Sequence, residues 1–277
     1  MTQMLALFGH PVSHSKSPAI HGVFGKENGI DLEYDLWDVP PETLVETVRH
    51  AFETGKIVGA NVTVPHKEGV IKACDHLTSE AKLAGAVNTL HFRDGKLWGH
   101  NTDGIGLVRD LKAKGAILSG KRILILGAGG ATRGALKPIL DELPEAVVLV
   151  NRTASRAEQL VNEYYAHDAA YQRLLTATSW QDEALGERAF DVIINATSSS
   201  LSNTFTPLPK GAIGGDTIGY DLMYSDEPTV FMEYLLEKGG KAVFDGIGML
   251  IEQAAYAFQF WFNCLPDTAG VYQLLRN

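Results

Sequence analysis

Cysteine is scarce in this sequence. Cys74 and Cys264 are the only two among 277 residues, which is too few for a disulfide framework or a cysteine-ligated zinc site. His10 and His14 have the spacing of two metal ligands on one helical face, and His21 follows, but Pro11 argues against a helix there. We therefore expect no metal site, histidines that face solvent or support a site indirectly, and a reducing, cytoplasmic compartment.

Long apolar runs and basic charge are also missing. No stretch of about 18 apolar residues occurs, so we expect no membrane span. The first apolar run, residues 4–8, has no basic flank before it and ends in turn residues, which indicates a strand and not a signal peptide. The formal net charge of −9 gives no attraction for nucleic acid or an anionic membrane. The expected partner is a small-molecule substrate, and the sequence is compatible with a monomer or a homodimer.

What the sequence does contain is the pattern of a folded α/β protein. With 45% hydrophobic and 21% charged residues, its composition is globular, and its length favours two moderate domains. Apolar runs alternate with helical patterns, and Ser17 before Pro18 supplies a hydroxyl cap at one helix start, as Pro40 and Pro41 mark another. An Asp94-Gly95 turn predicts an antiparallel hairpin that forms one sheet edge. The predicted strands are residues 4–8, 32–37, 60–64, 88–92, 97–100, 122–126, 146–150, 191–195 and 217–221.

We expect two α/β domains, with any hinge near Asp103 and residues 239–240. Residues 104–239 form a Rossmann-like nucleotide-binding domain. Residues 1–103 form a substrate domain with a mainly parallel sheet. The segment 248–262 is apolar nearly all round, which indicates a buried helix, and residues 240–277 are expected to return as helices to the substrate domain.

A glycine turn follows the predicted strand 122–126. Gly127, Ala128, Gly129, Gly130 and Ala131 stand between this strand and a helical pattern, the order that a pyrophosphate site requires. Helix N-terminal amides there donate to phosphate without a basic side chain. A third glycine would fall at position 132, where threonine stands, and Pro138 is expected to kink or shorten the helix. Taken alone, such a turn is equally compatible with a fold that binds nothing.

The end of the next strand favours a phosphorylated dinucleotide. Where sites for NAD place an acidic residue, this chain has Asn151, Arg152 and Thr153, with Arg156 one turn later. An arginine in a first helical turn opposes the helix dipole unless an anion neutralises it. These residues predict NADP (NADPH) as the cofactor, bound through its 2′-phosphate.

Four other polar features are ambiguous by themselves. Lys67 follows a strand and a proline turn, where a lysine is usually solvated, and Asp103 could simply cap the helix 105–112. His66 could tune a site but is expected to face water. The run from Asn195 to Ser200 lacks the G-x-S-x-G elbow of a nucleophilic serine, so a cofactor contact fits it better.

Five motifs together resemble the shikimate dehydrogenases, and they span the chain in that family's order and spacing. The motifs are GHPVSHSKSP at residues 9–18, NVTVPHK at 61–67, AGAVNTL at 84–90, NTDG at 101–104 and GIGML at 246–250 through Gln253. The resemblance implies an oxidoreductase that catalyses reversible NADPH-dependent reduction of 3-dehydroshikimate to shikimate. This reaction belongs to the shikimate/chorismate pathway of aromatic amino acid biosynthesis.

The resemblance also assigns residues. It implies Lys67 and Asp103 as the catalytic pair, with the lysine ammonium as proton donor and the aspartate orienting it. Ser15 and Ser17 would bind the substrate carboxylate, although either could instead cap the helix before Pro18. The residues implied to face the ring hydroxyls are Thr63, Asn88, Asp103, Tyr224 and Gln253, although an aromatic residue at Tyr224 could equally pack in a core or an interface. The residues implied to meet the nicotinamide half are Leu222, Gly246 and Met249.

Two alternatives remain open at this point. A quinate/shikimate dehydrogenase that prefers NAD would differ in the residues after the second nucleotide-domain strand, where Arg152 and Arg156 speak against it. A nucleotide-binding sensor without activity could share the fold, since fold alone does not guarantee chemistry. The presence of both Lys67 and Asp103 disfavours that sensor.

Overall fold

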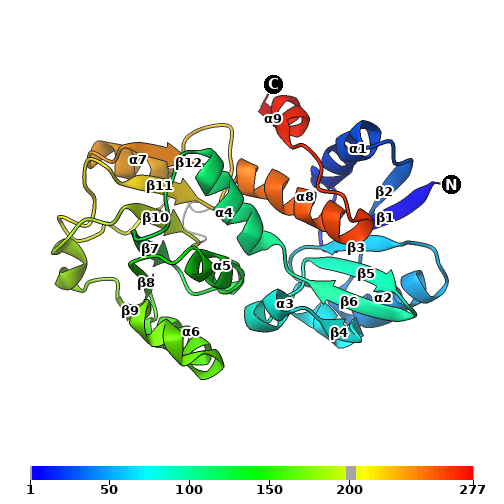
Figure 1. Ribbon diagram of the computed structural model, residues 1–277, viewed down its shortest axis with the longest axis horizontal. Coiled ribbons are helices and arrows are strands. Elements are labelled where there is room, and N and C mark those ends of the chain that lie inside the picture. Colours follow the sequence, from blue (N-terminus) through cyan, green and yellow to red (C-terminus); the bar gives the residue numbers. More distant parts are fainter. Residues whose placement is uncertain (1, 198–203, 277) are drawn as a thin grey trace. The chain divides into compact units, whose positions relative to one another are not determined.

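The computed structural model describes residues 2–197 and 204–276. The chain forms two compact units, Met1–Gly106 with Leu250–Asn277, and Leu107–Met249 (Figure 1). These units divide after residues 106 and 249, where the sequence suggested 103 and 239. The segment 240–277 is not helical throughout, because a short strand at Ala242–Phe244 joins the sheet of the second unit.

The first unit is built on a six-stranded mixed sheet in the order β2-β1-β3-β5-β6-β4. Strand β1 is parallel to β2 and β3, whereas β5 is antiparallel to β3 and β6. The hairpin β5–β6 is therefore present but is not the edge, because β4 lies outside it, parallel to β6. The Asp75 carboxylate accepts the Leu97 N–H at 2.7 Å and holds this two-residue strand in place. The strands are β1 Gln3–Gly9, β2 Leu32–Asp38, β3 Gly59–Val62, β4 His76–Leu77, β5 Thr89–Arg93 and β6 Lys96–His100.

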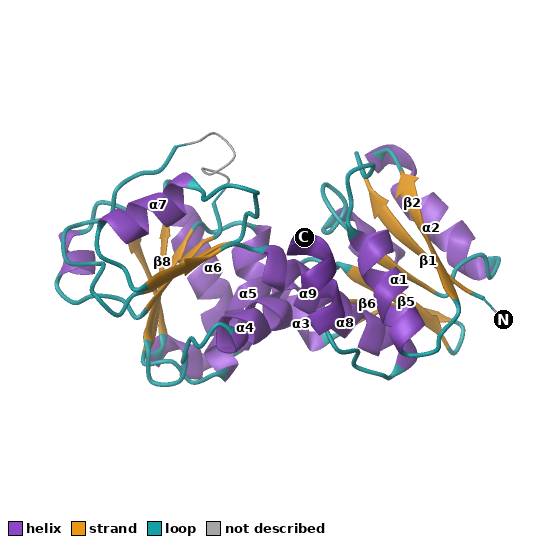
Figure 2. Cartoon of the chain, turned by 90° about the horizontal axis from the view of Figure 1, so that it is seen from above, coloured by secondary structure: helices purple, strands orange, loops and turns teal. Residues whose placement is uncertain are grey.

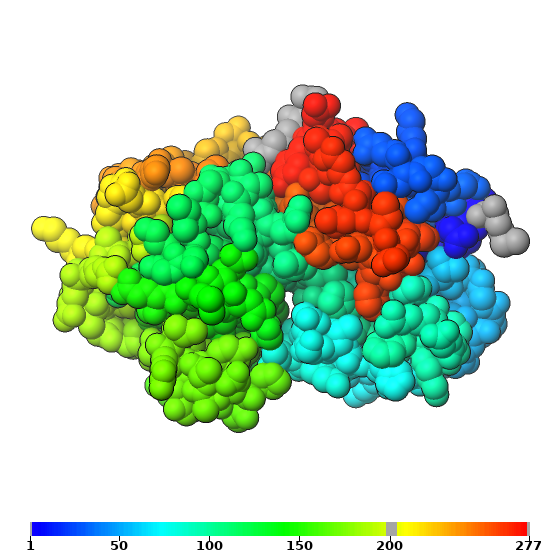
Figure 3. Space-filling view, viewed as in Figure 1, coloured from blue at the N-terminus to red at the C-terminus, as the bar shows by residue number. Residues whose placement is uncertain are grey.

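Helices cover both faces of this sheet, as the period-two alternation of β1 requires (Figure 2). Leu5 packs with Trp261 of α8, whereas Phe8 on the opposite face packs with Phe52 of α2. The residues of α8 are buried or half-buried, and the chain after it, red in Figure 3, reaches the surface. The helices are α1 Ser17–Glu27, η1 Pro41–Thr43, α2 Leu44–Glu53, η2 Gly69–Ala73, α3 Ser79–Ala84, α8 Ile247–Phe262 and α9 Ala269–Arg276.

The second unit is built on a six-stranded sheet in which every pair is parallel, in the order β12-β11-β10-β7-β8-β9. This is the Rossmann arrangement, whose strand order reverses beside β7. The sequence pattern missed β9 and β12, because β9 is a polar edge strand and β12 has three residues. The strands are β7 Arg122–Leu126, β8 Ala146–Asn151, β9 Leu175–Ser179, β10 Val192–Asn195, β11 Ile218–Asp221 and β12 Ala242–Phe244.

Alternating residues of β7 reach two separate cores. Ile125 packs with Leu136 of α5, and Leu126 packs on the other face with Phe231 of α7. Helix α5 continues through Pro138 to Asp141, so the proline does not shorten it. None of the helices in the described part of the chain is long and apolar enough to cross a membrane. The helices are α4 Asp103–Ala113, α5 Gly130–Asp141, α6 Ala154–His167, η3 Ala169–Arg173, η4 Glu183–Gly186 and α7 Val230–Glu237.

Candidate active site

Lys67 and Asp103 form an ion pair in the first unit, with 2.7 Å between Nζ and Oδ2. Lys67 lies in the turn after β3, and its carbonyl accepts the Val87 N–H at 2.7 Å. Asp103 is the first residue of α4. Its side chain is 12% exposed and that of Lys67 is 31% exposed. Lys67 is therefore not a solvated edge lysine, and the pair is shielded while still accessible to a ligand.

One further predicted residue, Asn88, contacts this pair, and a second, Gln253, contacts Asn88. Asn88, just before β5, donates from Nδ2 to Asp103 Oδ1 at 2.9 Å. The same Nδ2 lies 3.2 Å from Oε1 of Gln253, which comes from α8. The neighbouring Thr102 hydroxyl lies 3.4 Å from the same Gln253 oxygen. Four segments far apart in the chain thus converge on one carboxylate and one ammonium group.

The serine pair lies at the start of α1. The two hydroxyl oxygens of Ser15 and Ser17 are 3.1 Å apart. Neither serine caps the helix in the way the sequence suggested, because Lys16 occupies the N-cap position and makes no side-chain cap bond. Instead, Ser15 Oγ accepts the Ser17 N–H at 3.2 Å. Among the described residues, neither hydroxyl bonds to Lys67 or Asp103, so the site has two separate polar centres.

Thr63 follows β3 and packs against Gly9 at the end of β1. A Cβ atom on Gly9 would lie 2.4 Å from Thr63 Cγ2, a distance that real Cβ atoms do not show. The Thr63 N–H donates to Phe8 O at 2.9 Å, which ties this turn to β1. Any side chain at position 9 would therefore force Thr63 and Val12 to shift where the serine and lysine segments begin.

The histidines differ from the expectation of solvent exposure. His21 is fully buried and His66 is 1% exposed, with its Nε2 atom 2.6 Å from Val39 O. His10 is exposed and pairs with Asp38, and His14 is exposed. In the described ranges, no three His, Cys, Asp or Glu side chains form a group that could hold a metal ion. The expectation of a water-facing side chain was wrong for His66, because a turn position in the sequence does not show which face is covered. For His21, burial excludes the solvent-facing alternative and leaves that of a histidine that supports a site indirectly.

The burial of His21 predicts a loss of stability at acid pH. Burial lowers its pKa from 6.5 to about 3, so below pH 6.5 the unfolded chain takes up a proton that the folded chain does not. The contribution of His21 to stability is complete above pH 6.5 and falls as the pH drops toward 3, by about 1.4 kcal/mol per pH unit. Denaturant unfolding across this range should show a smaller acid loss in His21→Gln than in the unaltered chain. Replacing exposed His14 is the control, and equal acid losses in His21→Gln and the unaltered chain would contradict the assignment.

The glycine turn of the second unit has the geometry of an anion site. Gly127 has φ +102°, a left-handed conformation, and a Cβ there would lie 3.0 Å from Ala196 O. Added Cβ atoms on Gly129 and Gly130 would meet nothing within 4 Å. As at the start of any helix, the first amides of α5 have no partner within the helix. Thr132 stands at the position of the third glycine. Its buried hydroxyl donates to Gly127 O at 2.8 Å and so ties the helix start to the turn.

The two arginines after β8 are exposed. Arg152 precedes α6, Arg156 lies in its first turn, and that turn contains no acidic residue. Asn151 Nδ2 donates to Thr153 O at 2.9 Å and shapes the turn. Within residues 2–197 and 204–276, neither guanidinium makes a hydrogen bond or ion pair, so both are available to an anionic ligand.

The other predicted cofactor residues lie near the ends of β11 and β12. A Cβ on Gly246 would lie 2.2 Å from Leu222 O, so the two backbones are in contact. Met249 N–H donates to the Tyr220 hydroxyl at 3.1 Å. Tyr224 is 41% exposed, which excludes it from the core. Residues 198–200 of the predicted cofactor loop lie outside the described residues.

The sequence did not point to Asp221, which organises this region. Its buried carboxylate accepts from Met223 N at 3.1 Å and from the Thr229 hydroxyl at 2.7 Å. Asn195 Nδ2 donates to it at 3.2 Å. An aspartate at the end of an apolar strand was the only signal, and such a residue is usually exposed.

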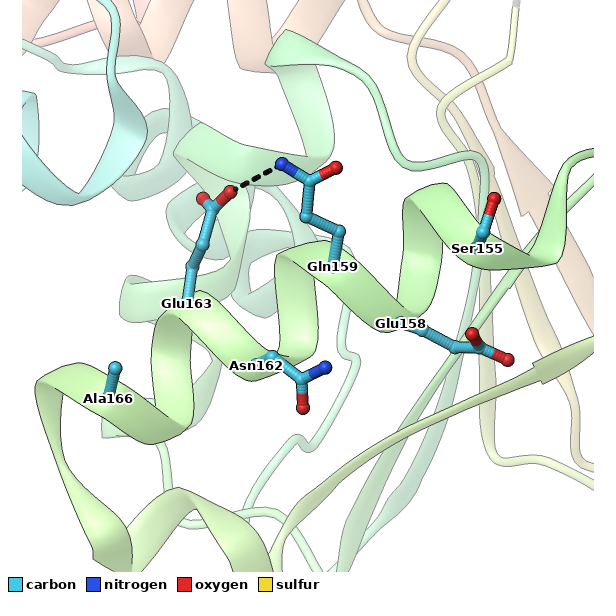
Figure 4. A pocket seen from close by; sticks show the side chains of 6 residues that line it. All are labelled: Ser155, Glu158, Gln159, Asn162, Glu163 and Ala166. Carbon is cyan, nitrogen blue, oxygen red and sulfur yellow. Dashed lines mark hydrogen bonds between the residues drawn. The ribbon is translucent and has the colours of Figure 1, made fainter.

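A pocket on α6 contains none of the predicted site residues (Figure 4). All six of its lining residues are exposed on one helix. Gln159 donates to Glu163 at 3.2 Å, and Arg133 pairs with Glu163. These contacts are those of a solvated helix surface. The lining residues are Ser155, Glu158, Gln159, Asn162, Glu163 and Ala166.

Comparison with known proteins shows matches along nearly the whole chain. Residues 7–90 match the shikimate dehydrogenase substrate binding domain, residues 110–204 match shikimate / quinate 5-dehydrogenase, and residues 246–276 match the shikimate 5′-dehydrogenase C-terminal domain. The shikimate dehydrogenase (NADP(+)) of Chromohalobacter salexigens is 45% identical over 98% of this chain and 97% of the relative.

Solved structures show the same likeness. The shikimate 5-dehydrogenase of Thermus thermophilus, in complex with NADP(H) and shikimate, is 34% identical with a TM-score of 0.85, covering 99% of this chain and 98% of the other. An Ael1 enzyme from Pseudomonas putida is 38% identical with a TM-score of 0.91 over 99% and 98% of the two chains. With such identity across nearly its whole length, the chain belongs to the shikimate dehydrogenase family.

Proposed function

We propose that this chain is an NADP-dependent shikimate dehydrogenase that reversibly reduces 3-dehydroshikimate to shikimate. The observation that carries the proposal is the Lys67–Asp103 ion pair, 2.7 Å long, with Asn88 in contact with its carboxylate. Reduction of a carbonyl needs a proton donor at its oxygen, and binding of a ring that carries hydroxyl groups needs polar side chains around it. The first unit supplies both, and the relatives of this chain carry the same activity in their names.

The residues of the second unit fit NADP. The open space beside Gly129 and Gly130 leaves helix amides available to a pyrophosphate. The exposed guanidinium groups of Arg152 and Arg156 suit a 2′-phosphate. When bound, NADPH supplies the hydride that adds to the substrate's carbonyl carbon.

Lys67 and Asp103 handle the proton. Negative charge grows on the carbonyl oxygen as the carbon is reduced, and the Lys67 ammonium donates a proton to that oxygen. Asp103 orients the ammonium group at 2.7 Å and accepts a hydrogen bond from the substrate. In the reverse direction, neutral Lys67 accepts the proton of the hydroxyl that is oxidised.

Neutral side chains bind the rest of the substrate. The Ser15 and Ser17 hydroxyls, 3.1 Å apart, donate to the carboxylate. We assign Thr63, Asn88 and Gln253 to the ring hydroxyls, and the family resemblance implies the same role for Tyr224. A cytoplasmic location and a monomeric or homodimeric state stay predictions from the sequence.

The direct test is NADPH formation by the purified, folded chain with shikimate and NADP. We expect turnover with this pair, and less with quinate or with NAD. No turnover in folded protein that still binds NADP would favour a nucleotide-binding sensor. Faster turnover with quinate and NAD would favour the NAD-dependent alternative.

A further inference from the structure

A further polar cluster of the first unit joins α1, β2 and β3. His21 on α1 and Tyr34 on β2 both contact the side-chain oxygen of Asn61 on β3. The Tyr34 hydroxyl is 2.8 Å from Asn61 Oδ1, and His21 Nε2 is 3.1 Å from it. The His21 and Tyr34 rings are stacked, with 4.8 Å between centroids and 6° between planes. Two side chains thus hold one amide oxygen.

The orientation of the Asn61 amide is fixed from its other side. Asn61 Nδ2 lies 3.2 Å from Asn88 O and 3.4 Å from the Thr89 hydroxyl. Asn61 and Thr89 are directly paired across strands β3 and β5. A backbone carbonyl only accepts, so the amide nitrogen must face it. The Asn61 oxygen therefore points to His21 and Tyr34, and both of them donate.

The Asn88 amide is fixed in the same way. The Thr102 backbone N–H only donates, and it lies 2.9 Å from Asn88 Oδ1. The Thr89 hydroxyl also donates to this oxygen, at 2.9 Å. Asn88 Nδ2 then faces Asp103 Oδ1, while Asp103 Oδ2 accepts from Lys67. One directed series of hydrogen bonds runs from His21 through Asn61, Thr89 and Asn88 to the Asp103 carboxylate, to which the Lys67 ammonium group also donates.

We propose that His21 and Tyr34 are positioning residues for the Lys67–Asp103 pair, acting through Asn61, Thr89 and Asn88. The inference rests on the proposed function, because it concerns the rate of that proton transfer. A buried amide oxygen that loses a donor is costly, and networks of this kind settle into one arrangement when every member is satisfied. Removing a donor from Asn61 loosens the amide that aligns Asn88 and, through it, Asp103.

The surroundings of His21 support a role for its Nε2–H. Its ring is fully buried and packs against the aromatic rings of Phe24, Phe258 and Trp261. In the described part of the chain, its Nδ1 atom is buried without a hydrogen-bond partner. Packing alone would be served better by phenylalanine, which leaves no polar atom unsatisfied. Burial also lowers the pKa of His21 to about 3, which keeps it a neutral donor.

The test is a set of substitutions at His21, read by steady-state kinetics with shikimate and NADP. His21→Phe should lower kcat by about 3- to 10-fold, the effect of one neutral hydrogen bond, and leave KM for shikimate within about twofold. His21→Gln places an amide N–H where Nε2–H was and should restore most of kcat. His21→Asn places its amide nearer the Nδ1 position and should not restore it.

Two further variants sharpen the test. Tyr34→Phe should lower kcat similarly and also raise KM, because Ser17 is a further hydrogen-bond partner of the Tyr34 phenol. His91→Phe is the matched control, since His91 also has a buried Nδ1 without a partner in the described residues and packs on Phe260. His91 is not part of the hydrogen-bond series from His21 to Asp103, so kcat of His91→Phe should equal that of the unaltered chain.

A wild-type kcat in folded His21→Phe, or equal losses in His21→Phe and His21→Gln, would overturn the positioning role. Thermal unfolding shows whether His21→Phe folds. If it does not, kcat of Tyr34→Phe and the difference in kcat between His21→Gln and His21→Asn test the positioning role. An unaltered chain that does not oxidise shikimate would count against the proposed function instead. The two failures are therefore distinguishable.

Discussion

Lys67→Ala should lower kcat for shikimate oxidation by about 10²- to 10⁴-fold, the usual contribution of a general acid or base. KM for shikimate should change little, because we propose that Ser15, Ser17, Asn88 and Gln253, and not Lys67, bind the carboxylate and ring hydroxyls. The ammonium group is 2.7 Å from Asp103 and has no other side-chain bond in the described structure. Its loss therefore removes proton transfer while the hydrogen bonds around Asn88 remain.

The measurement is initial rate against shikimate concentration at saturating NADP. Lys72→Ala is the matched control, because Lys72 is an exposed lysine of η2 in the same unit. It should behave like the unaltered chain. A Lys67→Ala variant with nearly unaltered kcat would remove Lys67 from the acid role, whereas a large rise in KM at unaltered kcat would make it a binding residue.

Replacing Arg152 and Arg156 together by alanine should raise KM for NADP by roughly 10- to 100-fold and leave KM for NAD almost unchanged. The estimate follows from two charge-assisted hydrogen bonds to a phosphate at an exposed site. Neither arginine has a competing acidic partner in the described residues, so the lost interactions are those with the ligand. NAD lacks the 2′-phosphate and gains nothing from either guanidinium.

Salt dependence gives an independent readout. KM for NADP should rise with ionic strength in the unaltered chain and rise less in the double variant, since screening acts on the same charges. Arg173→Ala is the control, because Arg173 is exposed in the same unit at the end of η3. Equal increases in KM for NADP and NAD in the double variant would show that the two arginines do not bind the 2′-phosphate.

The sequence predicted long, regular elements well and short ones poorly. The alternation of apolar strands and helices gave the central strands of both sheets, including β7 before the glycine turn. It missed β4, β9 and β12, because two or three residues, or a polar edge segment, carry no period of their own. Their pairing depends on neighbouring strands, and this is why the hairpin β5–β6 was wrongly expected at the edge.

The residues of the site were likewise predicted only in part from the sequence. Local motifs named Lys67, Asp103 and Asn88 through family resemblance, and each motif sits in a turn or at a helix start. No local pattern showed that His21 and His66 are buried, because burial depends on which helix or strand covers the residue. The sequence also did not show the hydrogen bonds that join Tyr34 to Asn61 and Asn61 to Asn88, since these residues belong to different segments of the sheet.

By itself, the sequence determined the residue types that the chemistry needs and the Rossmann order of strand, glycine turn and helix around residues 122–131. These are local properties, set by hydrophobic period, turn chemistry and spacing. Tertiary structure alone decided that Asn88 reaches Gln253, 165 residues away, and that Lys67 lies 2.7 Å from Asp103. Such contacts form only when the sheet and α8 pack together, because packing and not sequence distance sets which polar groups must satisfy one another.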